Sequence, residues 1–132
     1  MHKIAVLIDV QNMNANTPHD VLFKMLESTG RIEVRKAYAE WKSVCLDVEK
    51  ALSRNHVRRE HMTCTTATGK NAVDMQIVID TMNVLHEQDK LDTFVLVSGD
   101  MDYIPLITEI AGRGKRCIVA AHEGRIGGDT LQ

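Results

Sequence analysis

Long hydrophobic runs, paired cysteines and an excess of basic charge are all missing from this chain of 132 residues. No segment reaches the roughly 18 uninterrupted apolar residues of a membrane-spanning helix, so we expect no membrane partner. The run at 4–8 is also too short for the core of a signal peptide. The cysteines, Cys45, Cys64 and Cys117, are odd in number and far apart, which argues against a disulfide framework or a CxxC zinc site. We therefore expect a protein of the reducing cytoplasm.

The charge balance is close to neutral. Sixteen Lys and Arg stand against eighteen Asp and Glu, for a net charge of -2. Passive nucleic-acid binders commonly present a broad basic surface, and this composition does not supply one. Contact with nucleic acid would therefore depend on local features of the surface.

The apolar residues predict five strands. Three runs, at 4–8, 94–97 and 117–121, are continuously hydrophobic, which is typical of strands buried on both faces of a parallel sheet. Two more polar runs, at 32–41 and 57–65, mix β-branched and aromatic residues with charge, and they indicate strands nearer the sheet edge.

Helical patterns separate the strands, at 17–30, 44–52, 71–87 and about 102–111. The first opens with Thr17 as a cap and Pro18 at the first helical position. The third is apolar around most of its circumference, which predicts deep burial. Alternating strands and helices predict one three-layer α/β domain over residues 1–132, with 121–132 as a tail without a clear pattern.

Four aspartates fall at strand-to-helix junctions. Asp9 follows the first strand, Asp100 and Asp102 follow the fourth, and Asp74 lies in the first turn of the third helix. These junctions share one edge of a parallel sheet, so the carboxylates should converge. Two carboxylates about 5 Å apart repel by roughly 3 kcal/mol at an effective dielectric of about 20, so such a cluster must share protons or bind a cation. Oxygen ligands suit Mg²⁺ or Mn²⁺.

Each acid also has a structural alternative. Asn71 and Asp74 fit the spacing of a capping box, Asp102 fits a helix cap, and Asp9 fits a turn. Capping does not require all four acids to share one edge, which favours the site. Asp80 lies about 120° round the helix from Asp74, so we expect it to be buried or to support the site from outside.

These residues also carry a family resemblance. The matching segments are Ile-Asp-x-x-Asn at 8–12, Tyr-Ala-Glu-Trp at 38–41, Lys-Asn-Ala-Val-Asp at 70–74 and Ser-Gly-Asp-x-Asp-aromatic at 98–103. In this order they resemble the NYN domain, a LabA-like branch of the PIN-like nucleases. The resemblance implies a parallel five-stranded sheet of order 3-2-1-4-5 with helices on both faces. It further implies an acidic pocket that binds Mg²⁺ or Mn²⁺ for cleavage of RNA, less often DNA, with Asp9, Asp74, Asp100 and Asp102 as the catalytic, metal-binding acids.

Four polar or aromatic residues are candidates for substrate binding. Asn12 and Ser98 lie beside the acids and fit either phosphate contact or turn formation. Lys70 precedes the third helix, where it would neutralise a phosphate or remain only solvated. Trp41, the only tryptophan, would stack on a base or pack in the core. Another candidate is a local basic patch formed by Arg54, Arg58 and Arg59.

The expected function is a metal-dependent nuclease that hydrolyses phosphodiester bonds, in RNA more than in DNA. The alternative is a catalytically silent nucleic-acid-binding or regulatory module on the same fold. A receiver-like phosphotransfer domain would need an aspartate at the end of the third strand, and residues 63–66 contain none. The sequence does not determine the oligomeric state, and a homodimer remains open.

Overall fold

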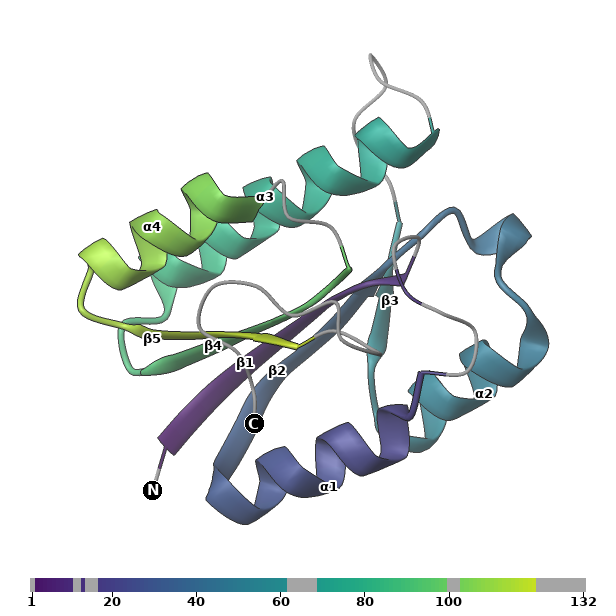
Figure 1. The fold of residues 1–132 in the computed structure, drawn as a ribbon, viewed down its shortest axis with the longest axis horizontal. Helices are drawn as coiled ribbons and strands as arrows, with labels where there is room; N and C mark the ends of the chain where they lie inside the picture. Colours follow the sequence, from purple (N-terminus) through teal and green to yellow (C-terminus); the bar gives the residue numbers. More distant parts are fainter. Residues whose placement is uncertain (1, 11–12, 14–16, 62–68, 100–102, 121–132) are drawn as a thin grey trace.

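A central parallel sheet organises the computed structural model, which describes residues 2–10, 13, 17–61, 69–99 and 103–120, with only the backbone at 69–71. Its strands run in the order β3-β2-β1-β4-β5, all parallel (Figure 1). The predicted order is therefore confirmed. The strands are β1 (His2–Asp9), β2 (Gly30–Tyr38), β3 (Arg58–Glu60), β4 (Thr93–Val97) and β5 (Arg116–Ala120).

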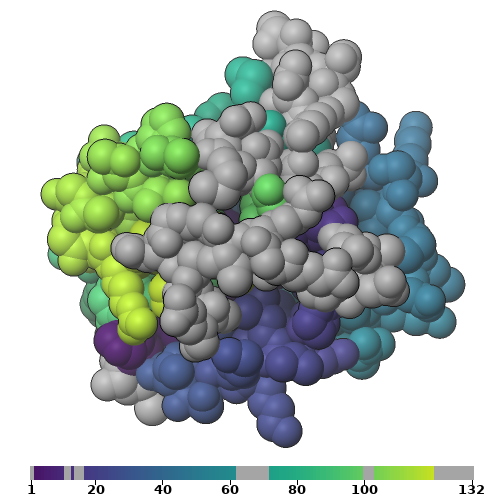
Figure 2. All heavy atoms as spheres, in the orientation of Figure 1, coloured from purple at the N-terminus to yellow at the C-terminus, as the bar shows by residue number. Residues whose placement is uncertain are grey.

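Helices cover both faces of this sheet, as predicted. Figure 1 shows α3 and α4 on one face and α1 and α2 on the other. In the same view drawn as spheres, α4 and α2 form opposite flanks of the molecule (Figure 2). The helices are α1 (His19–Thr29), α2 (Leu46–Arg54), α3 (Gly69–Glu87) and α4 (Ile104–Gly112). Within the described residues, no helix combines the length and hydropathy needed to cross a membrane.

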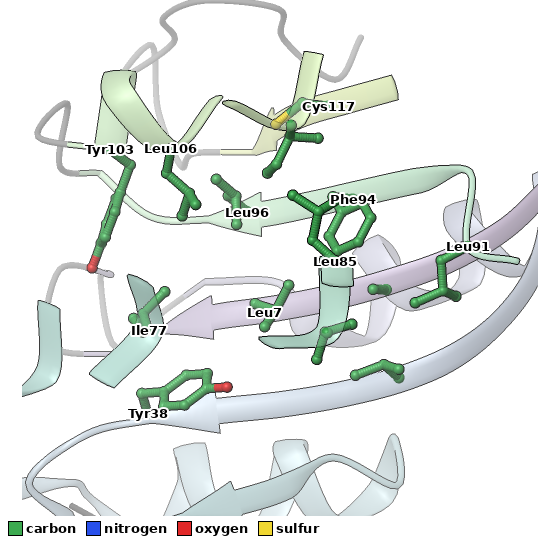
Figure 3. Close-up of a cluster of buried hydrophobic side chains, with 14 of the residues drawn as sticks. Leu7, Tyr38, Ile77, Leu85, Leu91, Phe94, Leu96, Tyr103, Leu106 and Cys117 are labelled. Carbon is green, nitrogen blue, oxygen red and sulfur yellow. The ribbon is translucent and has the colours of Figure 1, made fainter. Parts of the chain in front are cut away.

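The central strand β1 divides its side chains between two hydrophobic cores. Ile4, Val6 and Ile8 join the core beneath α1 and α2, whereas Ala5 and Leu7 join the core beneath α3 and α4 (Figure 3). Side chains alternate between the faces of a strand, so two buried faces require an uninterrupted apolar run. Each fully buried Ile or Leu contributes roughly 1.5–3 kcal/mol. The same alternation directs Asp9 to the face that α3 and α4 cover.

The predicted deep burial of α3 is wrong. Val73 and Ile77 are buried against the sheet, but Met75, Val78 and Ile79 are 43%, 38% and 47% exposed. A helix in an outer layer presents only one face to the sheet, so apolar residues on its other face remain accessible to solvent.

Several predicted element boundaries also differ from the structure, and three of these differences change the position given to a named residue. α3 begins at Gly69, which places Asp74 in the second turn and not the first, and rules out Asn71 as the cap of a capping box. β2 ends at Tyr38, so Trp41 lies beyond the strand, in the short 3-10 helix η2 (Trp41–Ser43). α1 begins at His19, with Pro18 at the cap position and no side-chain cap hydrogen bond, so Thr17 is not the cap.

Candidate active site

The carboxyl ends of β1 and β4 bring Asp9 and Ser98 together. Asp9 is the last residue of β1 and Ser98 directly follows β4, its neighbour in the sheet. Both side chains are buried, with exposures of 1% and 3%. The Ser98 hydroxyl donates a hydrogen bond to Asp9 Oδ2 at 3.1 Å. The sheet therefore fixes one oxygen of Asp9 through its neighbouring strand.

A tyrosine connects Asp9 to Asp74. Tyr103 is the residue just before α4, and its side chain is only 4% exposed. Its hydroxyl oxygen lies 3.1 Å from Asp9 Oδ2 and 3.0 Å from Asp74 Oδ1. Figure 3 shows the Tyr103 ring at the arrowhead end of β1 and β4. One hydroxyl group thus joins β1, α3 and the start of α4.

This arrangement concentrates negative charge. The two carboxylate oxygens contact the same hydroxyl oxygen, so they lie no more than about 6 Å apart, and at an effective dielectric of about 20 their repulsion is on the order of 3 kcal/mol. Burial, together with the charges of Asp9 and Asp74, raises the pKa of Tyr103 above its ordinary value. The phenol therefore stays protonated, but its single hydrogen serves only one carboxylate at a time. Additional positive charge would stabilise the pair.

A second tyrosine holds the other acid of α3. The Tyr38 hydroxyl donates to Asp80 Oδ2 at 2.9 Å, and Gln76 Nε2 donates to Asp80 Oδ1 at 2.9 Å. Burial and the neighbouring Asp80 raise the pKa of Tyr38, which keeps its hydroxyl a donor. Asp80 is partly buried, in keeping with a supporting role, and it ties α3 to β2. The Tyr38–Asp80 contact therefore holds α3 to the sheet through groups other than those that join Asp9, Tyr103 and Asp74.

The candidate metal ligands among the described residues are carboxylate oxygen atoms, hard ligands of the kind that Mg²⁺ and Mn²⁺ prefer. Mg²⁺ commonly binds one or two carboxylates and keeps several waters, so Asp9 and Asp74 match its requirements. Within the described part of the chain, no group of three or more His, Cys, Asp or Glu residues is placed to hold a metal ion. The predicted residues Asp100, Asp102 and Asn12 lie outside the described residues, as does the side chain of Lys70.

Trp41 lies further along the same edge. Its indole Nε1 donates to the carbonyl oxygen of Glu60 at 2.8 Å, and the Arg59 guanidinium lies 5.7 Å from the centre of its ring. Glu60 ends β3, and β2 separates that strand from β1. The structure therefore places Trp41 at the carboxyl edge but on the β3 side, away from Asp9.

The three arginines of the predicted basic patch, Arg54, Arg58 and Arg59, all form ion pairs. Each contacts a carboxylate of its own: Arg54 pairs with Asp20, Arg58 with Glu60, and Arg59 with Glu49. Exposed pairs of this kind contribute little stability, yet they neutralise the local charge. The predicted basic patch therefore loses most of its positive potential.

Sequence reasoning missed the roles of Tyr103 and Tyr38. Tyr103 belongs to the Ser-Gly-Asp-x-Asp-aromatic element, so the motif did contain it. Which way its hydroxyl points depends on how α4 packs over the sheet, and no local pattern encodes that packing. Tyr38 gave even less signal, since an aromatic residue near a strand end usually packs in the core.

The fold and the converging acids define a PIN-like α/β domain, and comparison with known proteins gives the family. The model of the NYN domain matches residues 3–129, and the chain belongs to this family, part of the PIN-like nuclease superfamily. The crystal structure of a Vibrio parahaemolyticus protein of unknown function, VPA0982, has a similar fold, with a TM-score of 0.68 and 21% identity over 90% of this chain and 80% of that one. No curated protein matches the sequence.

Proposed function

We propose that this NYN protein is a metal-dependent nuclease that hydrolyses phosphodiester bonds, in RNA more readily than in DNA. The main support is the convergence of Asp9 and Asp74 on the hydroxyl of Tyr103, at 3.1 and 3.0 Å. The two acids come from β1 and α3, so a local turn or cap does not account for their approach. Family membership supports nuclease chemistry, and the preference for RNA is part of the proposal.

Mg²⁺ or Mn²⁺ is the proposed cofactor, and when bound it would polarise a phosphate oxygen and lower the pKa of a coordinated water. Asp9 and Asp74 would hold the ion, and Asp100 and Asp102 would join them according to the family motif. Ser98 restrains Asp9 through its hydrogen bond, and Tyr103 sets the separation of the two carboxylates. Asn12 and Lys70 are the proposed contacts to the phosphate backbone.

The chain's own residues orient the reaction. Carboxylate oxygens that stay fixed hold a water in line with the phosphorus atom, which supplies much of the rate enhancement through positioning. Asp9 is buried and bonded on one oxygen, so it has little freedom to rotate. The expected products are a 5′-phosphate and a 3′-hydroxyl.

A cleavage assay with matched variants tests this function. Labelled single-stranded RNA and DNA of one sequence are incubated with Mn²⁺ or with EDTA. We expect cleavage that EDTA abolishes and that falls by about 10²-fold or more in Asp74→Asn and Asp100→Asn, the scale of a directly catalytic group. Asp80→Asn is the control on the same helix, since Asp80 contacts Tyr38 and Gln76 and not the Asp9–Asp74 pair.

Two results would reject the proposal. Cleavage at the parental rate by purified Asp74→Asn and Asp100→Asn would place the activity elsewhere. Tight binding of nucleic acid without cleavage in Mn²⁺ would favour the silent binding module, although clustered negative charge does not help a protein to bind a polyanion.

A further inference from the structure

A pocket of about 520 Å³ lies on the β3 side of the sheet edge that also carries the candidate active site, and the proposed chemistry does not use it. It is lined by Ala39, Glu40, Trp41, Lys42 and His61. These residues follow the carboxyl ends of β2 and β3. Its volume is within the range of small-ligand sites, roughly 300–1,000 Å³. The pocket is therefore large enough for a nucleotide base.

The indole ring of Trp41 is held in a fixed position within this pocket. Its Nε1 donates to the Glu60 carbonyl at 2.8 Å, and the Arg59 guanidinium lies 5.7 Å from the ring centre. The ring also packs against the core beneath α1 and α2, while remaining partly exposed. An aromatic group that is already immobile loses little conformational entropy when a ligand stacks on it.

Charged side chains of both signs, Glu40 and Lys42, line the pocket beside the aromatic ring. Lys42 is exposed, and among the described residues no carboxylate forms an ion pair with it. The imidazole of His61 adds a second polar group at the pocket wall. An aromatic platform beside an exposed lysine is typical of sites for single-stranded nucleic acid, in which the ring stacks on a base and the lysine contacts a phosphate.

The pocket and the acids share one continuous edge of the sheet. Glu60 pairs with Tyr38, and Tyr38 pairs with Asp9, so two strand spacings, about 10 Å, separate Glu60 from Asp9. Building on the proposed function, we propose that this pocket binds a base of single-stranded nucleic acid whose backbone continues to the Asp9–Asp74 pair. The inference defines the substrate as single-stranded and gives Trp41, Lys42 and His61 a common role.

The fluorescence of Trp41 reports directly on occupancy, because the chain has one tryptophan. Protein in EDTA is titrated with an adenosine hexaribonucleotide and with an abasic hexamer of the same sugar-phosphate backbone. We expect the hexaribonucleotide to quench Trp41 and the abasic hexamer to leave its emission unchanged. Equal responses to both, or no response to either at concentrations that saturate binding, would overturn the proposal.

Substitutions then locate the contact. In Trp41→Ala the affinity for a dye-labelled hexaribonucleotide should fall about 5- to 150-fold, the range that corresponds to loss of one base stack. Lys42→Ala should weaken binding, whereas Lys24→Ala, which removes the same charge from α1, should not. Trp41→Phe keeps a stacking ring, so we expect a smaller loss of affinity. This variant tests the contact if Trp41→Ala does not fold.

The two proposals fail separately. Metal-dependent cleavage that requires Asp74, combined with equal affinity in Lys42→Ala, Trp41→Phe and the parent, would reject the base pocket and keep the nuclease. Quenching that depends on the bases, combined with no cleavage, would support the pocket and reject the nuclease.

Discussion

The hydroxyl oxygen of Tyr103 lies 3.0 Å from Oδ1 of Asp74, and this contact ties the start of α4 to the second turn of α3. We predict that Tyr103→Phe weakens Mn²⁺ binding by about 10- to 100-fold, the usual effect of removing a group that orients metal ligands. The carboxylates would lose their shared donor and gain freedom to separate. Calorimetric titration with Mn²⁺ measures the loss, and kcat should fall more than KM rises.

Tyr38→Phe is the matched control. It also removes a buried hydroxyl that bonds to a carboxylate of α3, but its partner is Asp80. Both variants should lose comparable stability, about 1.5–3 kcal/mol for a hydrogen bond to a charged group. Only Tyr103→Phe should change Mn²⁺ affinity. Equal Mn²⁺ affinities in the two variants and the parent would show that Tyr103 does not orient the metal ligands and acts only in the stability of the fold.

The second prediction is that a substitution at Gly30 lowers the stability of the fold. It joins α1 directly to β2, and a Cβ atom there would lie 2.3 Å from the carbonyl oxygen of His2, its partner residue in β1. Backbone atoms cannot move aside as a flexible side chain does, so Gly30→Ala should destabilise the fold by about 1–3 kcal/mol. Gly112→Ala is the control, since its Cβ would meet nothing within 4 Å and should stabilise the end of α4 slightly. Urea denaturation compares both with the parent.

The third prediction is that the buried His19 makes the stability of the fold depend on pH. Its side chain is 3% exposed, and burial lowers its pKa from the ordinary 6.5, against a smaller opposing effect of Asp20. The unfolded chain therefore takes up a proton near pH 6.5 that the folded chain resists. The contribution of neutral His19 is complete above about pH 6.5 and decreases as the pH falls below it. Urea midpoints at several pH values should show a flatter acid-side dependence in His19→Gln, and parallel curves would contradict the assignment.

The sequence predicted what depends on local pattern. Continuous apolar runs identified β1, β4 and β5, and parallel topology predicted that acids after different strands would meet at one edge. The direction in which a side chain points depends on tertiary packing, so the sequence predicted it less well. Trp41 was predicted to lie within the second strand, but it follows the end of β2, and its indole donates a hydrogen bond to the carbonyl oxygen of Glu60. The exposed face of α3 was missed because hydropathy alone does not reveal how many layers cover a helix.

The last prediction concerns the metal itself. Because the folded acid pair should bind the cation and the unfolded chain scarcely does, free Mn²⁺ at 100 times its dissociation constant should stabilise the fold by roughly 2.7 kcal/mol. Asp9→Asn and Asp74→Asn should lose most of this gain, since each removes one charged oxygen ligand. Both should fold without metal, because removing one carboxylate relieves repulsion on the order of 3 kcal/mol between carboxylate oxygens that lie no more than about 6 Å apart. Thermal melts in MnCl₂ and in EDTA measure the difference, with Asp80→Asn expected to keep the full gain. Coincident melting curves for the parent with and without metal would show that Asp9 and Asp74 hold no cation, and their approach would then need a structural explanation.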